Sequence, residues 1–174
     1  HEAVRKMAFV KRIPGTMQLN GTAMVIGATG SIGAVSAKLL SLIFKKVILV
    51  APREERLREL KLEIEKMSPN CEILCTTDSN ALAGEADAVV TATSAYDQKI
   101  VDVDRFKPGC VVSDCSRPLD FSFSDARRRP DVLIIESGEV ILPGPVKLTC
   151  DIGLHKNVFY ACLGETVVLA MEKR

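Results

Sequence analysis

A glycine-rich turn between an apolar strand and a helix constrains this chain more than any other feature. Residues 23–26 are apolar, and residues 27–33 follow as GATGSIG. In a strand–turn–helix unit of this kind, the first glycine permits the sharp turn, the second lets a phosphate approach the backbone, and the third lets helix and strand pack closely. The first amides of the helix and the positive end of its dipole then face the anion. The predicted diphosphate-binding residues are Gly27, Ala28, Thr29, Gly30, Ser31, Ile32 and Gly33.

Alternating apolar and helical segments predict the architecture of the rest of the chain. Residues 47–51, VILVA, are continuously apolar, which is typical of a parallel strand buried on both faces. The other expected strands are 23–26, 72–75, 88–92, 110–113 and 132–135, with short helices near 81–86 and 124–129. Strands alternating with helices indicate an α/β fold with a doubly wound, mostly parallel sheet, Rossmann-like, in the order 3-2-1-4-5-6. We expect Gly138 to turn the sixth strand into a hairpin with residues 140–142.

Length and charge limit the classes of partner. The chain has 174 residues, of which 47% are hydrophobic, and its formal net charge is +1 with acids and bases interspersed. This balance leaves no basic footprint for nucleic acid, and we interpret the triplet 127–129, RRR, as a solvated helix end. No apolar run approaches the ~20 residues of a membrane span, and no signal peptide opens the chain. We therefore expect a cytoplasmic protein with reduced thiols.

The first residues suggest a chain that continues upstream. The sequence begins with His1, and apolar positions 3, 4, 7 and 8 share one helical face among basic residues. We expect residues 1–19 to be the tail of a helix from a missing N-terminal domain, which would be a partner within the same chain. Residues 20–174 are expected to form one NADP-binding domain with a C-terminal helix.

The residues after the second strand distinguish NAD from NADP. An acidic residue about 20 positions beyond the last glycine binds the ribose 2′-hydroxyl of NAD, whereas an arginine accommodates a 2′-phosphate. Position 53 is arginine, and Arg56 follows at the head of the next predicted helix. Two guanidinium groups could clamp a phosphate, although Glu54 and Glu55 keep an ordinary helix surface open as the alternative. We expect NADP to be the cofactor.

Two hydroxyl residues follow the fourth strand. Thr93 and Ser94 lie at the carboxyl end of that strand, where open α/β sheets place their ligand crevice. Their hydroxyls could meet cofactor ribose or phosphate, and a simple turn is the alternative.

The six cysteines do not form a metal-binding pattern. They include no CxxC pair, and the chain has only two histidines, so no metal site is expected. Asn157 is a good N-cap for a helix over residues 158–173, which places Cys162 early in that helix. The helix dipole there would stabilise a thiolate nucleophile, and a structural cysteine is the alternative. His155 could activate Cys162 or could be a loop residue.

Four segments together resemble a known family. These are GATGSIG, the arginine-bearing turn after the second strand, RRRPDVLIIESGEV and above all FYACLGETVVLAMEK. From Asn20 onward the chain is similar to the C-terminal part of the long-chain acyl-[acyl-carrier-protein] reductase family, within a wider group of predicted amino-acid or shikimate-type dehydrogenases. The resemblance implies an NADPH-dependent reductase that converts an acyl thioester into an aldehyde, with Cys162 as the nucleophile. The substrate would be a small-molecule or carrier-protein-bound acyl group.

The resemblance lacks one part of the family pattern. The N-terminal half, which implies the acyl and carrier-protein site, is absent from these 174 residues. We therefore expect this piece to bind NADPH and to turn over poorly or not at all.

Three other functions remain open. The first is a hydroxy-acid or amino-acid dehydrogenase without a covalent step, and the second is a non-catalytic NADP-sensing module. The third, a short-chain dehydrogenase, needs a Tyr followed four positions later by Lys. Tyr96 is followed at that spacing by Ile100 and Tyr160 by Gly164, which disfavours it.

Overall fold

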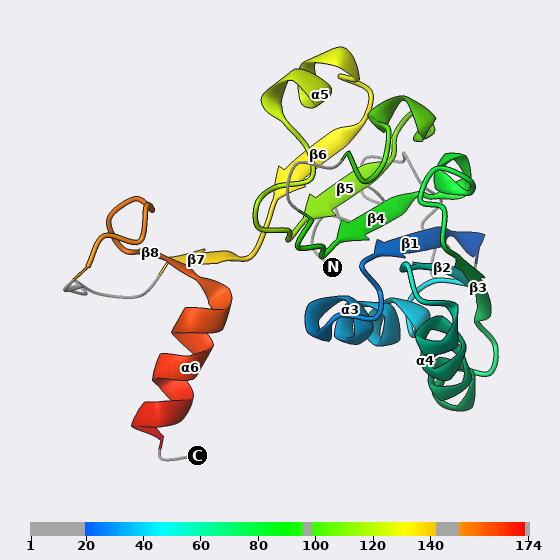
Figure 1. The fold of residues 1–174 in the computed structure, drawn as a ribbon, viewed down its shortest axis with the longest axis horizontal. Coiled ribbons are helices and arrows are strands. Elements are labelled where there is room, and N and C mark those ends of the chain that lie inside the picture. Colours follow the sequence, from blue (N-terminus) through cyan, green and yellow to red (C-terminus); the bar gives the residue numbers. More distant parts are fainter. Residues whose placement is uncertain (1–19, 96–98, 142–149, 173–174) are drawn as a thin grey trace. The chain divides into compact units, whose positions relative to one another are not determined.

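A six-stranded parallel sheet forms the larger of two units. The computed structural model describes residues 20–95, 99–141 and 150–172, and the chain divides into units after Glu136. The strands are β1 (Thr22–Ile26), β2 (Lys46–Val50), β3 (Glu72–Thr76), β4 (Ala88–Thr91), β5 (Val111–Asp114) and β6 (Leu133–Glu136). Their order is β3-β2-β1-β4-β5-β6 and every pairing is parallel, which confirms the Rossmann-like prediction (Figure 1).

The crossover segments of this unit are helices and short turns. They are α3 (Ser31–Ser41), α4 (Glu54–Met67), the 3-10 turn η1 (Ala83–Glu85), the 3-10 turn η2 (Val103–Arg105) and α5 (Phe123–Arg128). Helices α3 and α4 lie beside each other against the sheet (Figure 1). The helix expected near 81–86 is a 3-10 turn, and the one expected at 124–129 is α5. The predicted helix tail at residues 1–19 lies outside the described residues.

The sheet is buried on both faces. Successive side chains of a strand point to opposite faces. In β2, Val47 and Leu49 accordingly belong to one core cluster, and Ile48 and Val50 belong to the other. The first cluster includes the helix residues Ala37, Leu57, Leu60 and Ile64, and the second includes the loop residues Val101, Val103, Phe106 and Phe121. The continuously apolar sequence of this strand is therefore required by packing on both sides.

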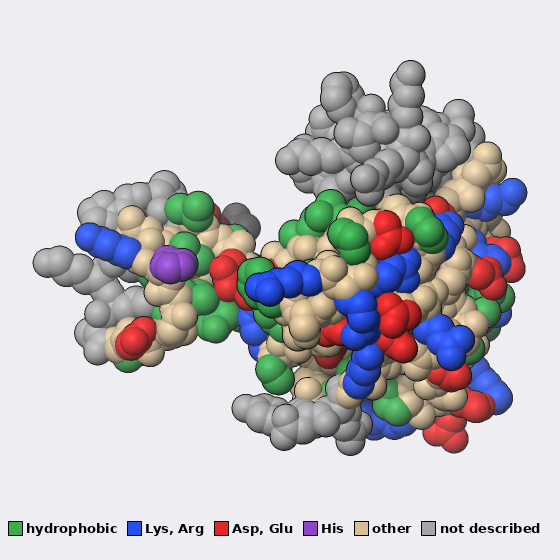
Figure 2. All heavy atoms as spheres, turned by 90° about the horizontal axis from the view of Figure 1, so that it is seen from above, with side chains coloured by type: hydrophobic (Ala, Val, Ile, Leu, Met, Phe, Trp, Pro, Cys, Tyr) green, Lys and Arg blue, Asp and Glu red, His purple; other side chains and the backbone are tan. Residues whose placement is uncertain are grey.

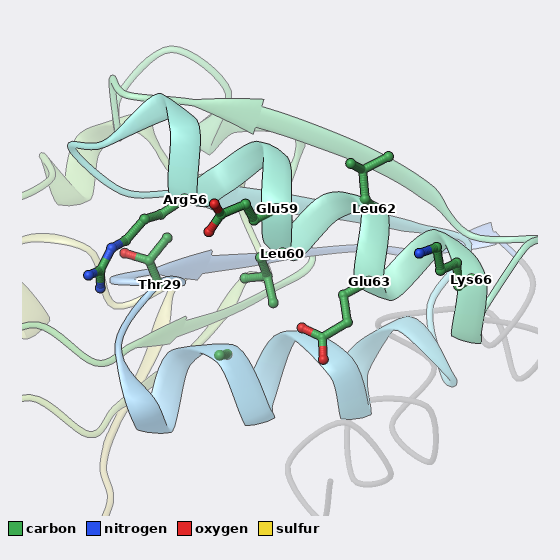
Figure 3. Close-up of a pocket in the computed structure, with 8 residues that line it drawn as sticks. Thr29, Arg56, Glu59, Leu60, Leu62, Glu63 and Lys66 are labelled. Atoms are coloured by element: carbon green, nitrogen blue, oxygen red, sulfur yellow. The ribbon is translucent and has the colours of Figure 1, made fainter.

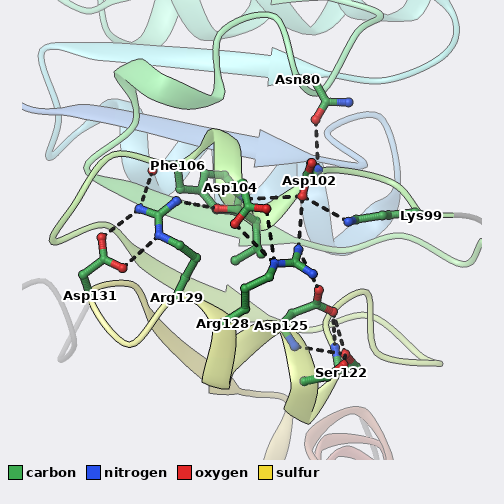
Figure 4. Close-up of polar contacts among 12 residues, drawn as sticks. Asn80, Lys99, Asp102, Asp104, Phe106, Ser122, Asp125, Arg128, Arg129 and Asp131 are labelled. Atoms are coloured by element: carbon green, nitrogen blue, oxygen red, sulfur yellow. Dashed lines mark hydrogen bonds and ion pairs between the residues drawn. The ribbon is translucent and has the colours of Figure 1, made fainter.

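Arg129 ties the segment before β6 to the segment before β5. Its Nε and Nη2 donate to the two carboxylate oxygens of Asp131, each at 2.8 Å. Its Nη1 and Nη2 also donate to the carbonyls of Val103 and Phe106, at 3.2 and 2.9 Å (Figure 4). With only 17% of its side chain exposed, Arg129 is a structural link.

Arg128 makes a second set of ion pairs in the same region. Its guanidinium lies 3.2 Å from a carboxylate oxygen of Asp102, 3.2 Å from Asp104 and 3.3 Å from Asp125 (Figure 4). The interpretation of the arginine triplet as a solvated helix end holds for Arg128, which is exposed at the end of α5, and is wrong for Arg129, which is largely buried. The partners of Arg128 at Asp102 and Asp104 lie more than twenty residues away, so local composition does not reveal them.

The second unit is a two-stranded ribbon followed by a helix. Strand β7 (Glu139–Ile141) pairs antiparallel with β8 (Val158–Tyr160), and α6 (Ala161–Met171) follows directly. The expected hairpin between the sixth strand and residues 140–142 is wrong, because β7 pairs with β8 while β6 joins the parallel sheet. Gly138 instead has φ +90° and its carbonyl accepts the amide of Ala161 at 2.8 Å.

The expected helix start at Asn157 is also wrong. Asn157 has φ +66° and Tyr160 is the N-cap of α6. Residues 158–160, VFY, are β-branched or aromatic and extend along β7 with Phe159 buried, so strand pairing overrides the local capping signal.

The surface carries mixed charge. On the face of the molecule seen in Figure 2, Lys and Arg side chains lie among Asp and Glu side chains over the larger unit. In the ranges that the structure describes, every helix is too short or too polar to cross a bilayer.

The Arg129–Asp131 pair predicts a pH-dependent contribution to stability. The hydrogen bonds and charge of Arg129 lower the pKa of Asp131 below its ordinary value of about 4. The ionised carboxylate of Asp131 therefore stabilises the fold at pH values above its ordinary pKa. This contribution is lost as the pH falls through the lowered pKa. We expect Asp131→Asn to lower the unfolding temperature by a few degrees at pH 7 and by progressively less below about pH 4.

Thermal unfolding followed by circular dichroism from pH 7 to pH 3 measures this difference. Glu59→Gln, at an exposed position of α4, is the charge-matched control. A deficit for Asp131→Asn that stays constant across this range would contradict the role of the ion pair.

Candidate functional site

The glycine turn is tied to the end of the neighbouring strand. The amides of Gly27 and Ala28 both donate to the carbonyl of Val50 at the end of β2, at 2.9 and 3.0 Å. The amide of Gly30 donates to the carbonyl of Gly27 at 3.0 Å. These bonds fix the path from β1 into α3, so the turn presents a defined backbone surface.

Two of the three glycines are required by the fold itself. Gly27 has φ +83°, and a Cβ there would lie 2.4 Å from the carbonyl oxygen of Ala92. A Cβ on Gly33 would lie 2.1 Å from the carbonyl oxygen of Gly27. Both contacts are with backbone and are too close to be relieved by a side-chain movement. The turn, β4 and α3 can therefore approach one another only through these glycines.

The middle glycine has a different environment. A Cβ on Gly30 would meet the Gly27 carbonyl oxygen at 3.3 Å and the Ala92 oxygen at 3.9 Å, and the residue has φ −77°. The fold could accommodate a Cβ there with a small adjustment. Gly30 is thus less crowded than Gly27 and Gly33, and it lines the neighbouring cavity with bare backbone.

The N-terminus of α3 is suited to an anion. Gly30 is its N-cap, without a side-chain cap, and its first turn holds no acidic residue. The amides of Ser31, Ile32 and Gly33 have no carbonyl one turn earlier to accept them. Free amides and the helix dipole at this position favour a bound phosphate. The side chain of Ala28 is fully buried and belongs to the first core cluster.

A crevice of about 570 Å³ opens beside the turn. It lies at the carboxyl ends of β1, β2, β3 and β4, where the strand order reverses between β1 and β4, and its volume is in the range of small-molecule sites. The lining residues from the turn and strand ends include Gly27, Thr29, Gly30, Val50, Ala51, Pro52, Ala92, Thr93 and Ser94. The structure thus brings both predicted hydroxyl residues to the same cavity as the glycine turn.

A second cleft, of about 590 Å³, lies between α3 and α4. Thr29 and Arg56 lie together at one end of it, with the guanidinium of Arg56 next to Thr29 (Figure 3). Thr29 also lines the crevice, so Arg56 borders the region that a ligand on the glycine turn would enter. Arg53 is the exposed N-cap residue of α4, and it lines neither the crevice nor the second cleft. Of the two arginines, Arg56 therefore has the better geometry for a 2′-phosphate.

A buried hydrogen-bond network supports the crevice from the β5 side. The carboxylate of Asp114, 1% exposed, accepts Thr91 Oγ1 at 2.8 Å and the amide of Ser116 at 3.0 Å on one oxygen. Its other oxygen accepts the amides of Asp120 and Phe121 at 2.8 and 3.1 Å. The loop after β5 is thereby wrapped around one carboxylate.

This network joins the crevice at Thr93. The amide of Thr93 donates to Ser116 Oγ at 3.0 Å, and its hydroxyl donates to Asp120 Oδ1 at 2.7 Å. Sequence reasoning missed these loop residues and the crevice residues Thr77, Ser79 and Lys99. Their position in the sequence could have indicated them, because DCSRPLD follows a predicted strand and so lies at the carboxyl edge of the sheet.

Cys162 occupies the first turn of α6 in the second unit. It is exposed, it follows Tyr160 and Ala161 at the helix start, and the first turn contains no acidic residue. By contrast, burial raises the pKa of Cys71 to about 11 and that of Cys110 to about 12, so these thiols stay protonated near neutral pH. Cys162 is therefore better placed for nucleophilic chemistry than these two.

Sequence comparisons find a partial relative. No known family model matches the chain. Aminotransferase PigE from Serratia sp. (strain ATCC 39006) is 32% identical over 105 residues, which are 59% of this chain and 12% of PigE. The chain thus corresponds to a small part of that relative.

Similar solved structures share the fold. A dipicolinate synthase polypeptide from Bacillus halodurans matches with a TM-score of 0.56 at 16% identity, over 78% of this chain and 44% of that one. Quinate dehydrogenase from Corynebacterium glutamicum, in complex with NAD, matches with a TM-score of 0.53 at 18% identity, over 75% and 48%. 5-Ketofructose reductase of Gluconobacter sp. strain CHM43 gives 0.54 at 15%, over 75% and 49%. The chain spans less than half the length of each, and at these identities the likeness shows the fold alone.

The different surroundings of the glycines predict separable effects. Gly33→Ala places a Cβ 2.1 Å from a backbone oxygen, and we expect it to destabilise the fold by about 3 kcal/mol in urea unfolding. Gly30→Ala should cost about 1 kcal/mol or less while reducing NADPH affinity at least about tenfold, because an added methyl group would hinder the close approach of a phosphate to the backbone. Urea titration and NADPH fluorescence measure the two effects. A fully stable Gly33→Ala, or a Gly30→Ala that binds NADPH normally, would contradict this assignment.

Proposed function

We propose that the chain binds NADP(H) in the crevice at the glycine turn and serves hydride transfer. The observation that carries the proposal is the N-terminus of α3, which has no side-chain cap and begins beside Gly30, a residue that lines a cavity of about 570 Å³. Backbone packing requires glycine at positions 27 and 33, whereas Gly30 is exposed and brings bare backbone to the wall of this cavity. A diphosphate fits this cavity in size and charge.

The phosphate-bearing form of the cofactor is the better fit. Arg56 is exposed at the start of α4 and lies by Thr29, at the edge of the glycine turn. A guanidinium can bind a phosphate through two parallel hydrogen bonds, which a 2′-hydroxyl does not require. Glu54 and Glu55 in the same helix turn disfavour an anion, so the preference depends on Arg56.

The proposed reaction is reduction of an acyl thioester. The thiolate of Cys162 would attack the carbonyl carbon, forming a new thioester and releasing the thiol of the substrate. When bound, the cofactor would supply the hydride that reduces this thioester, giving an aldehyde once a proton returns the cysteine to the thiol. The position of Cys162 supports the first step, because it is exposed in the first turn of α6, where a substrate can reach it.

The substrate and partners are part of the same proposal. The acyl group would arrive on coenzyme A or on a carrier protein, and an N-terminal domain of the same chain would hold it. PigE gives no direct guide to the reaction, since the similar region is 12% of that protein and its name describes an aminotransferase.

A dehydrogenase without a covalent step is the second candidate. The likeness in fold to quinate dehydrogenase and 5-ketofructose reductase supports it, since their names describe direct oxidation or reduction of a small substrate. In that case Cys162 would have no chemical role, and its replacement would leave activity intact. A non-catalytic NADP sensor would use the same crevice.

Arg56 predicts the cofactor preference. We expect Arg56→Ala to weaken NADPH binding about tenfold, because a charge-assisted contact with the 2′-phosphate is lost, and to leave NADH binding unchanged. Arg58→Ala is the matched control, since Arg58 is exposed on the same helix and pairs with Glu54. Isothermal titration with each nucleotide measures the effect. Tighter binding of NADH than of NADPH by the unaltered chain would reverse the assignment.

Cys162 predicts a covalent adduct. In the full-length protein with its N-terminal domain, we expect incubation with a long-chain acyl-CoA, without NADPH, to add one acyl group at Cys162, and NADPH then to release it as aldehyde. Intact-mass and peptide mass spectrometry of the full-length protein and of its Cys162→Ala and Cys150→Ala variants measure the site, because Cys150 is also exposed. Equal acylation at both cysteines would indicate nonspecific reaction. Absence of any adduct in a full-length protein that binds NADPH would favour the dehydrogenase.

A further inference from the structure

Thr93 lines the crevice, and its hydroxyl proton is held in a hydrogen bond to a carboxylate. Thr93 Oγ1 donates to Asp120 Oδ1 at 2.7 Å. A hydroxyl has one proton and two acceptor sites, and an ionised carboxylate can only accept. While this bond holds, Thr93 Oγ1 can offer a ligand only an acceptor.

The loop holds Asp120 in this orientation. Its Oδ2 accepts Ser116 Oγ at 2.7 Å, and Ser116 Oγ in turn accepts the amide of Thr93 at 3.0 Å. The donors therefore follow one direction, from the Thr93 amide through Ser116 to Asp120. Asp114 anchors the loop beneath with four donors on its two oxygens. Reversal of the Thr93 hydroxyl would leave Asp120 short of a donor, which is costly in a partly buried site.

Because Thr93 Oγ1 can only accept a hydrogen bond, it favours those groups of a dinucleotide that can donate one. Phosphate oxygens also accept, and the carboxylate of Asp120 lies directly behind Thr93, so a phosphate here would meet two acceptors and a like charge. A ribose hydroxyl or a carboxamide N–H is a neutral donor and matches the free acceptor sites of Thr93. The crevice is thus divided into a donor region at the amides of α3 and an acceptor region at Thr93.

The position of Thr93 indicates which half of the ligand meets it. A sheet of this topology consists of two halves, each of which binds one mononucleotide. Arg56 follows β2 in the first half, which places the adenosine 2′-phosphate there, whereas Thr93 follows β4 in the second half. We infer that Thr93, positioned by Asp120, accepts a hydrogen bond from a hydroxyl or amide N–H of the nicotinamide riboside and disfavours phosphate at that point. The inference rests on the proposed binding of NADP(H).

Two probes separate the halves of the cofactor. NADP+ carries the nicotinamide riboside, whereas adenosine 2′,5′-bisphosphate carries the adenosine phosphates alone. Isothermal titration of the 174-residue chain is made with both probes. We expect Thr93→Val to weaken NADP+ about tenfold and to leave the bisphosphate unchanged. Thr93→Ser, which keeps the hydroxyl, should restore NADP+ affinity.

Asp120→Asn tests the positioning role separately. A neutral amide can donate a hydrogen bond to Thr93 Oγ1, which frees the Thr93 O–H to point into the crevice as a donor. We therefore expect weaker binding of NADP+ with no loss of affinity for the bisphosphate. Thermal unfolding of each variant verifies that the chain is folded. If a variant is unfolded, Thr93→Ser still tests the inference, since a loss confined to NADP+ in that variant would contradict the hydroxyl contact.

The contrary outcomes are distinct. Equal losses for both probes in Thr93→Val would assign Thr93 to a phosphate and overturn the inference while the proposed function stands. Unchanged NADP+ binding in Thr93→Val would overturn it equally. If the unaltered chain binds neither probe, the proposed function fails and the inference fails with it.

Discussion

The close approach of three backbone segments at Gly27 is the constraint on which the rest of the larger unit depends. The Cα of Gly27 lies against the carbonyl of Ala92 after β4, and its own carbonyl lies against the Cα of Gly33 in α3. Its amide is bound to Val50 at the end of β2. One residue therefore joins the ends of β1, β2 and β4 to the start of α3. That junction forms the floor of the crevice, so fold and candidate site share the same contacts.

The parts that sequence reasoning predicted are those governed by local rules. The glycine spacing, the apolar strands and the alternation of strands with helices led to the parallel sheet and its order, and both are confirmed. Packing on both faces of β2 required its unbroken apolar sequence. The same rules located Thr93 and Ser94 at the crevice, because a residue that follows a central strand lies at the carboxyl edge of the sheet.

The parts that it missed depend on partners distant in sequence. Residues 158–160 have a good helix signal around them, yet they pair with β7 because a buried Phe159 and antiparallel hydrogen bonds outweigh a local cap. Arg129 reaches carbonyls more than twenty residues away, which composition alone cannot indicate. The Asp114 network likewise uses a short loop in which aspartate and serine are ordinary turn residues. Their role becomes visible only when the loop after β5 lies beside the end of β4.

The central claim is that a dinucleotide occupies the crevice above the Gly27 junction. Two-dimensional ¹⁵N NMR of the 174-residue chain during titration with NADP+ tests it most directly, because each backbone amide reports separately. The account predicts saturable shifts concentrated in residues 27–33 and 93–94, with little change in the strands at the edge of the sheet. Saturable binding whose shifts fall elsewhere, or the absence of shifts in the glycine turn at millimolar NADP+, would contradict it.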